Sequence, residues 1–125
     1  MLDRVLLIVE DDPDLRETWK DLFELSDYTV HAFASVSAAL ADTAAVRGSN
    51  MLITDYHLED SNGIDLIRSA RRINPDLPAV VLTGLRQDHV RHALASEPDV
   101  ELFFKPVRME VIENYIESRF TGGAA

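Results

Sequence analysis

Residues 7–13 read LIVEDDP, so an apolar run passes directly into three acids and a proline. The run at residues 5–9 contains no polar side chain, which is typical of a strand covered on both faces, as in a parallel sheet. Glu10, Asp11 and Asp12 follow at once, although neighbouring carboxylates repel one another and resist burial. Either the three acids lie in solvent at the end of the strand, or a positive group binds there.

Four other short segments read as strands, and segments of helical periodicity separate them. Three of them are continuously apolar: MLI (51–53), AVVL (79–82) and LFF (102–104). The fourth, YTVHAF (28–33), alternates between apolar and polar residues, which suits a strand at the edge of the sheet. The helical faces are carried by Leu15, Trp19, Leu22 and Phe23; by Val36, Ala39, Leu40 and Ala44; by Ile64, Ile67 and Ala70; by Val90, Ala93 and Leu94; and by Met109, Ile112, Ile116 and Phe120. This alternating order predicts an α/β fold, a doubly wound five-stranded parallel sheet with five helices.

The starts of three helices are marked by their residue types. Pro13 suits a first helical turn, where its missing N–H costs nothing. Ser35 can cap the second helix, and either Ser61 or Asn62 can cap the third, because these side chains accept hydrogen bonds from the first turn. The helices are therefore expected to begin close to these positions.

Length and composition narrow the class of protein. The 125 residues fit one domain, placed at residues 1–120, and the small residues at 121–125 are expected to form a flexible tail. No apolar run approaches the roughly 20 residues of a membrane-spanning helix, and there is no cysteine. The net charge of −10, from 22 acids and 12 bases, disfavours binding to a nucleic-acid backbone and favours cations. We expect a cytoplasmic domain that binds neither nucleic acid nor membrane.

The carboxyl ends of the core strands carry polar residues to one edge of the predicted sheet. The first strand ends at Glu10, the third at Asp55, the fourth at Thr83 and the fifth at Lys105. In doubly wound sheets, sites form beyond the carboxyl ends of the strands, where the strand order reverses. One acid at a strand end is ordinary, but agreement among four strands indicates a site.

With these residues in place, the chain resembles the receiver domains of two-component response regulators, the family that includes the small chemotaxis regulators. The resemblance rests on LLIVEDDP (6–13), LITDYHLEDSNGIDLI (52–67), VVLTG (80–84) and FFKP (103–106), in family order. It implies the flavodoxin-like receiver fold, with strand order 2-1-3-4-5. It also implies a signalling domain that catalyses only its own phosphorylation and dephosphorylation.

The resemblance further implies a metal site. Glu10, Asp11, one oxygen of Asp55 and the backbone carbonyl of His57 would hold Mg²⁺, with Mn²⁺ as an alternative. Mg²⁺ takes about six oxygen ligands near 2.1 Å, so waters would complete the set. Asp12 would be a neighbour of this site and a candidate helix cap rather than a ligand.

Asp55 is implied as the phosphoacceptor, with a histidine kinase or a phosphotransfer protein as the donor. Thr83 and Lys105 would contact the phosphoryl oxygens, and Gly84 would leave room beside them. In the family the bond between this lysine and Pro106 is cis, which aims the lysine inward. The phosphorylated domain, a monomer or a weak dimer, would then bind an unidentified downstream protein.

Two departures from the family pattern leave questions open. Leu102 occupies the position of an aromatic residue that usually relays phosphorylation to the output face, while Phe103 and Phe104 are expected to pack in the core. The chain is therefore either a phosphorylation switch or a receiver-like interaction module that no longer cycles. Leu58 and Glu59 replace a common Met-Pro pair, so the loop after Asp55 is expected to be less rigid.

Other classes fit the sequence less well. A haloacid-dehalogenase-type phosphatase carries its nucleophile after the first strand in a D-x-D pattern, but this chain reads EDD there. A flavin-binding flavodoxin-like module would place a Ser/Thr/Gly-rich phosphate loop at that point, where the acids here would repel a phosphate. His89 and His92 lie three residues apart, but without a third ligand nearby we interpret them as surface residues.

Overall fold

Five parallel strands form one sheet in the order β2-β1-β3-β4-β5. The computed structural model describes residues 4–84 and 88–121. The strands are β1 (Val5–Val9), β2 (Thr29–Phe33), β3 (Met51–Asp55), β4 (Ala79–Thr83) and β5 (Val100–Phe104). β1 pairs with both β2 and β3, so the strand order reverses beside β1. The predicted doubly wound α/β sheet and its edge strand β2 are confirmed.

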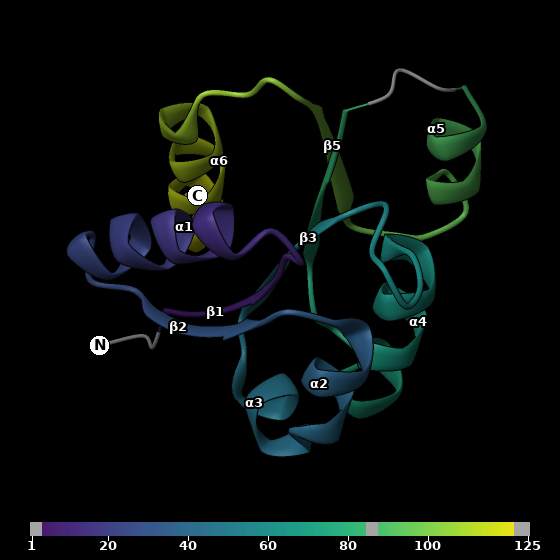
Figure 1. Cartoon of the computed structure of the whole chain (residues 1–125), viewed down its shortest axis with the longest axis horizontal. Helices are drawn as coiled ribbons and strands as arrows, with labels where there is room; N and C mark the ends of the chain where they lie inside the picture. Colours follow the sequence, from purple (N-terminus) through teal and green to yellow (C-terminus); the bar gives the residue numbers. More distant parts are fainter. Residues whose placement is uncertain (1–3, 85–87, 122–125) are drawn as a thin grey trace.

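Helices cover both faces of the sheet (Figure 1), because side chains alternate between the two faces along each strand. The helices are α1 (Pro13–Leu25), α2 (Val36–Ala41), α3 (Thr43–Gly48), α4 (Gly63–Ile73), α5 (Asp88–Leu94) and α6 (Met109–Thr121). Leu6 packs in one core cluster with Trp19 of α1 and Ile112 of α6. Leu7 packs in a second cluster with residues of α2, α3, α4 and α5.

The segment predicted as one helix after β2 forms two short helices, so the described residues contain six helices rather than five. The break falls at Asp42, whose carboxylate accepts a hydrogen bond from the Ala45 N–H (3.1 Å) and caps α3. An aspartate that bonds to the backbone in this way competes with continuation of a helix. The break turns Ala45 and Val46 into the core, while Ala44, predicted on the apolar face, is exposed.

The predicted helix starts are confirmed. Pro13 opens α1, and the Asp12 carboxylate accepts hydrogen bonds from the next two N–H groups at 3.0 and 3.3 Å. Ser35 accepts from the Ala38 N–H (3.1 Å) and caps α2. Of the two candidates at the start of α4, Asn62 is the cap. Asp12 is thus occupied as a helix cap, as the sequence suggested.

Other expectations fall at the ends and on the surface of the chain. α6 continues to Thr121, one residue into the expected tail, and residues 122–125 lie outside the described part. His92 is exposed, as expected, whereas the side chain of His89 lies outside the description. Within residues 4–84 and 88–121, no helix has the length and apolar character needed to cross a bilayer.

Gly63 lies where the backbone of β3 passes close to the start of α4. A Cβ atom there would stand 3.0 Å from the Asp55 carbonyl oxygen and 3.2 Å from the Tyr56 Cα, both backbone atoms. Backbone cannot move aside as a flexible side chain can, so Gly63→Ala is expected to lower the free energy of unfolding by about 1–3 kcal/mol. Urea denaturation measures this change.

Gly48→Ala is the matched control for Gly63→Ala, because a Cβ at Gly48 would meet no atom within 4 Å. Alanine is favoured over glycine within a helix by about 1 kcal/mol, so this variant should be neutral or more stable. Equal losses of stability in the two variants would contradict the argument from close backbone approach.

Candidate functional site

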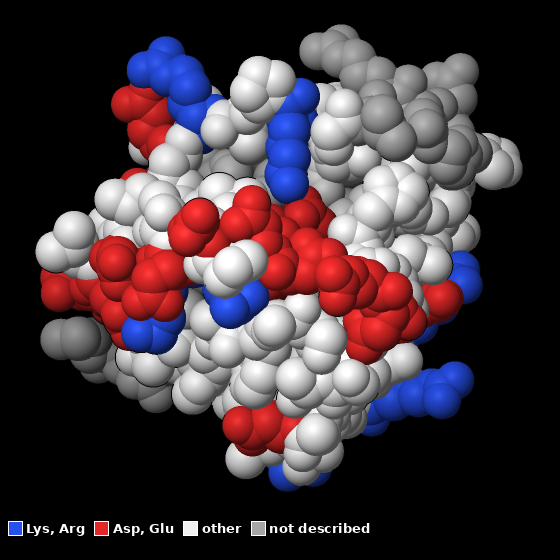
Figure 2. Space-filling view, in the orientation of Figure 1, with Lys and Arg blue, Asp and Glu red and all other residues white. Residues whose placement is uncertain are grey.

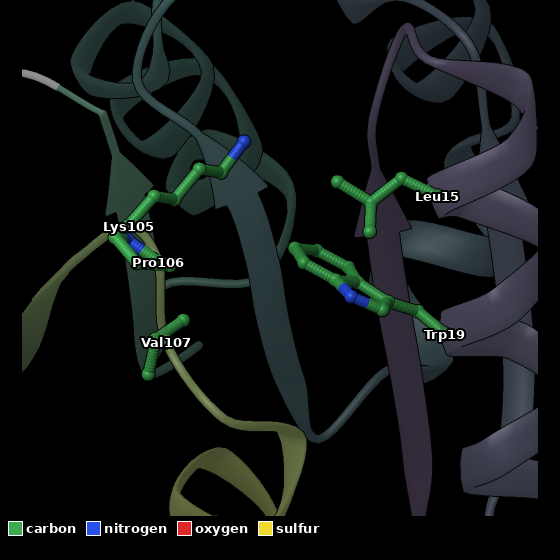
Figure 3. Close-up of a pocket in the computed structure, with 5 residues that line it drawn as sticks. All are labelled: Leu15, Trp19, Lys105, Pro106 and Val107. Carbon is green, nitrogen blue, oxygen red and sulfur yellow. The ribbon is translucent and has the colours of Figure 1, made fainter.

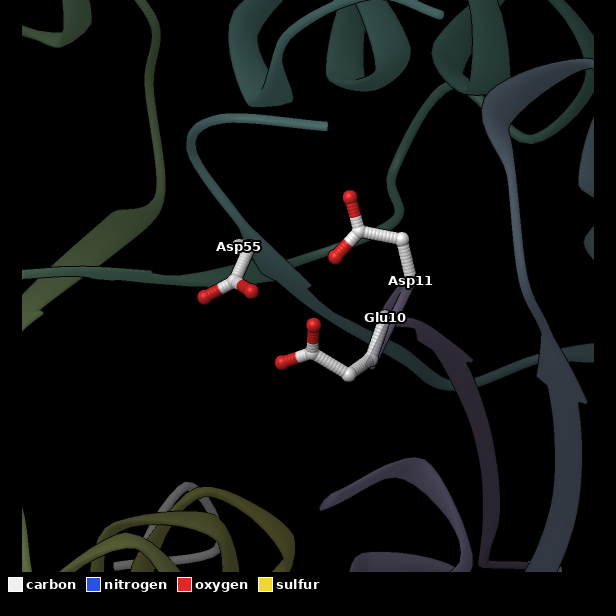
Figure 4. Close-up of side chains that lie close together, drawn as sticks. All are labelled: Glu10, Asp11 and Asp55. Atoms are coloured by element: carbon white, nitrogen blue, oxygen red, sulfur yellow. The ribbon is translucent and has the colours of Figure 1, made fainter. Parts of the chain in front are cut away.

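Three carboxylates meet at the carboxyl edge of the sheet, where the strand order reverses. Glu10 follows β1 directly and is 1% exposed, Asp55 ends β3 and is 7% exposed, and Asp11 is partly exposed. One oxygen from each lies within 4.8 Å of the others. Figure 4 shows the three side chains converging from the ends of β1 and β3. The structure thus brings together the three acids that the sequence placed at this edge.

Lys105 faces the acids from the end of β5. Its Nζ lies 2.6 Å from Asp55 Oδ1 and 3.8 Å from Glu10 Oε1. The Lys105–Pro106 peptide bond is cis, as expected, and the Lys105 N–H donates to the Thr83 carbonyl at 2.7 Å. One lysine therefore contacts two buried carboxylates.

The charge in this site is unbalanced. Burial raises the pKa of Glu10 to about 8, and the hydrogen bond and negative charge of Asp55 act in the same direction. Glu10 Oε1 is buried and has no hydrogen-bond partner among the described residues. A buried carboxylate oxygen of this kind is costly unless a cation or a proton meets it.

The donors present suit a hard divalent cation. The three carboxylates supply only oxygen ligands, which Mg²⁺ and Mn²⁺ accept. Glu10 Oε1, which is buried and accepts no hydrogen bond from the described residues, could serve as one of these ligands. The role of the His57 carbonyl stays a prediction: His57 is exposed, forms a β-bridge with Asn62, and its ring packs edge-on against that of Tyr56.

Thr83 ends β4 beside the acids. Thr83 is 2% exposed, and it directly follows Leu82, which pairs in register with Asp55. Gly84 comes next, and a Cβ there would meet no atom within 4 Å, so there is space beside Thr83 as expected. Thr83 therefore ends the strand next to that of Asp55, and Lys105 directly follows β5, one strand further out.

Two residues that sequence reasoning passed over hold the loops of the site. Arg16, on the first turns of α1, donates to the Glu10 carbonyl at 2.9 Å. Asp60, in the connection between β3 and α4, accepts hydrogen bonds from the N–H groups of Val36 (3.1 Å) and Ser37 (3.0 Å). The Asp60 contacts join segments 23 and 24 residues apart, whereas Arg16 ties α1 to the end of β1 six residues earlier. The sequence signal for either residue was a charge near the motif.

The connection after Asp55 lacks the proline of the common family pattern, yet it is closed by hydrogen bonds. The Gly63 N–H donates to the Tyr56 carbonyl at 2.6 Å, and the Leu58 N–H donates to the Ser61 carbonyl at 3.1 Å. Leu58 itself is buried in the core cluster around α4. These contacts supply constraints where the sequence predicted a less rigid loop.

The side chains around Leu102 divide between the two faces of β5. Leu102 packs against the core cluster beside α5. Phe103 lies on the opposite face, with its ring 5.8 Å from that of Tyr115. The Arg91 guanidinium of α5 stands 5.2 Å from the centre of the Phe104 ring. Phe103 and Phe104 are both partly buried, and Phe104 places an aromatic ring on the face toward α5.

An apolar pocket adjoins the site. It has a volume of about 420 Å³ and is lined by Leu15, Trp19, Lys105, Pro106 and Val107, between α1 and the start of the β5–α6 connection (Figure 3). Figure 2, in the orientation of Figure 1, shows acidic side chains that form a band across this face of the molecule, with a basic side chain reaching the edge of the band. The site is thus bordered by both apolar and acidic surface.

A parallel sheet of order 2-1-3-4-5, with acids at the switch point and a lysine opposite, defines the receiver class of signalling domains. A family model described as the response regulator receiver domain matches residues 6–117, so the chain belongs to that family. The chain is therefore a receiver domain of two-component signal transduction, a signalling domain rather than a conventional enzyme.

Individual relatives agree with this assignment. The response regulator receiver protein CpdR of Brucella abortus (strain 2308) is 28% identical over 90% of this chain and 92% of CpdR. The C4-dicarboxylate transport transcriptional regulatory protein DctD of Rhizobium meliloti (strain 1021) is 34% identical over 63% of this chain, but that match spans only 17% of DctD. The non-phosphorylated HemR receiver domain from Leptospira biflexa aligns with a TM-score of 0.85 and 26% identity, covering 95% of each chain.

Proposed function

We propose that residues 1–120 act in the cytoplasm as a phosphorylation switch: Asp55 accepts a phosphoryl group from a histidine kinase or a phosphotransfer protein. The observation that carries the proposal is the ion pair between Lys105 and Asp55 at 2.6 Å inside a cluster of buried acids. A carboxylate held beside a cation at the open edge of a sheet is placed to attack an electrophile. Phosphorylated and unphosphorylated forms then differ in their affinity for a downstream protein.

The residues divide the work of phosphoryl transfer among them. An Asp55 oxygen forms the new bond to phosphorus while the bond from phosphorus to the donor nitrogen breaks, and the electron pair leaves with that nitrogen. Lys105 moves its charge from Asp55 to a phosphoryl oxygen, and the Thr83 hydroxyl donates to another. Glu10, Asp11 and Asp55 would hold Mg²⁺, which supplies positive charge against the approaching anions when it is bound.

The surroundings of the site support a protein as the donor. The apolar pocket lined by Leu15, Trp19 and Val107 lies directly beside Lys105. A donor protein that covers this pocket with apolar side chains would bring its phosphohistidine to Asp55 and exclude water from the reacting atoms. We propose that this pocket is the apolar part of the docking surface for the phosphodonor.

Modification of the protein by acetyl phosphate tests the proposed function directly. Incubation with acetyl phosphate and Mg²⁺ is expected to add one phosphoryl group, detected as a mass increase of the intact protein, and chelator is expected to prevent it. A mass that never changes in the presence of Mg²⁺ would reject the proposed switch and favour a module that no longer cycles.

The second candidate, a receiver-like module without cycling, is favoured by Leu102 at the usual aromatic position. We expect beryllofluoride with Mg²⁺ to shift amide resonances beyond the site, as far as α5. Thr83 pairs in register with Phe104, and Phe104 contacts Arg91 of α5. Two-dimensional NMR spectra with and without beryllofluoride measure this. Shifts confined to the acid cluster would show that coupling to α5 is absent.

A further inference from the structure

The connection between β3 and α4 is fastened to α2 by one carboxylate. Asp60 lies in this connection, and its two oxygens accept hydrogen bonds from Val36 (3.1 Å) and Ser37 (3.0 Å), the first two residues of α2. Ser35 accepts from the Ala38 N–H, the third donor of that turn. The N–H groups that open a helix have no partner inside the helix, so Asp60 supplies two of the partners that α2 needs.

The chemistry of Asp60 fits this role. The backbone N–H of Ser37, followed by that of Val36, holds the pKa of Asp60 below its usual value. The carboxylate is thus ionised at neutral pH, and charge-assisted hydrogen bonds of this kind are stronger than neutral ones. The contact spans 24 residues of sequence to Val36, so it joins two elements rather than closing a local turn.

The connection between β3 and α4 begins directly after Asp55. His57 lies two residues beyond Asp55 and three before Asp60, and the hydrogen bonds of Tyr56 and Leu58 close the connection within itself. Those internal bonds fix its shape, whereas the bonds of Asp60 fix its position relative to α2. A change at Asp60 therefore reaches the backbone beside the acid cluster without touching an acid of that cluster.

We propose that Asp60 is a positioning residue, which holds the His57 carbonyl in place through its contact with α2 and thereby sets the affinity of the site for Mg²⁺. This inference rests on the proposed function, because it takes the acid cluster as an Mg²⁺ site. Groups that orient metal ligands from outside typically change metal affinity or activity by about 10–100-fold when they are replaced.

Three variants separate position from charge, since each removes one negative charge from the same connection. Asp60→Ala removes both hydrogen bonds, and Asp60→Asn keeps a carbonyl oxygen that can accept one of them. Glu59→Gln is the matched control, because Glu59 is exposed and makes no hydrogen bond or ion pair with the described residues. Asp60 is itself exposed, so its variants are expected to stay folded.

The experiment is a titration of each folded protein with MgCl₂, followed by amide chemical shifts of the acid cluster. Relative to the parent, Asp60→Ala is expected to bind Mg²⁺ about tenfold more weakly. Asp60→Asn should fall between Asp60→Ala and the parent, and Glu59→Gln should change by less than about twofold, as expected for screened surface charge. If Asp60 contributed only to the stability of the fold, the folded variants would all bind Mg²⁺ with the affinity of the parent.

Hydrogen exchange in chelator provides a readout without metal. The amides of Val36 and Ser37 are expected to exchange about tenfold faster in Asp60→Ala than in the parent, and to be unchanged in Glu59→Gln. Equal Mg²⁺ affinities in Asp60→Asn, Asp60→Ala and Glu59→Gln would overturn the positioning role and leave only charge. An absent response to Mg²⁺ in the parent would instead overturn the proposed function, whatever the exchange rates show.

Discussion

Asp55→Asn is expected to abolish phosphorylation by acetyl phosphate in Mg²⁺, a loss of more than about 1,000-fold on the scale of nucleophile replacements. The amide nitrogen has no charge and no lone pair suited to attack phosphorus, so an acyl phosphate cannot form. The side chain keeps almost the same size in a site where it is 7% exposed, so the fold should persist. The rate of mass increase of the intact protein measures the effect.

Asp12→Asn is the matched control for Asp55→Asn. Asp12 lies at the same edge of the sheet and carries the same charge, but its carboxylate caps α1 through the Asp14 and Leu15 N–H groups. Asparagine is as good a helix cap as aspartate, so stability and phosphorylation should both change little. A loss of phosphorylation in Asp12→Asn equal to that in Asp55→Asn would contradict the separation of Asp12 from the site.

The sequence predicts the carboxyl edge of the sheet well because parallel strands impose it. Once continuous apolar runs are interpreted as strands covered on both faces, the residues that end them must gather at one edge. Asp55 lies 45 residues after Glu10, and Lys105 lies 50 residues after Asp55, yet two ion pairs link Lys105 to both acids. Backbone pairing alone determines that meeting, so local patterns were sufficient.

What the sequence could not predict depends on contacts between distant side chains and backbone. The break at Asp42 follows from a hydrogen bond that competes with the helix, and an aspartate in a polar stretch gives no warning of it. Asp60 finds its partners across 24 residues. The burial of Glu10 rather than Asp11 depends on the packing around β1, since both acids follow the same apolar run.

The second large effect concerns stability in the absence of metal. Glu10→Gln is expected to raise the free energy of unfolding in chelator at pH 8 by a few kcal/mol, with about 4 kcal/mol as the upper bound set by the full pKa shift. The pKa of Glu10 is raised to about 8, chiefly by burial, from an ordinary value of 4.5. A group whose charged form is disfavoured in the folded state costs stability when it ionises, and glutamine has no charge to bury.

The stabilising effect of Glu10→Gln is expected to grow as pH rises. Between about pH 4.5 and 8 the folded protein holds a proton on Glu10 that the unfolded chain has lost, so the Glu10 contribution to stability falls as pH rises through this window. Glu10→Gln should remove that slope, and the two proteins should converge near pH 4. Urea denaturation in chelator at several pH values measures both curves. A less stable Glu10→Gln at pH 8 would contradict the argument.

Mg²⁺ should offset much of this difference in stability at pH 8. In the parent, a cation that binds only the folded acid cluster stabilises it by about 2.7 kcal/mol at 100 times its dissociation constant. Glu10→Gln replaces the buried carboxylate by a neutral amide, which binds a divalent cation far more weakly, so its response should be largely lost. Asp11→Asn should also lose the response but gain less in chelator, because Asp11 is partly exposed and its charge is better solvated. The same acid is then costly without metal and stabilising with it, which explains how a buried strand can end in adjacent carboxylates.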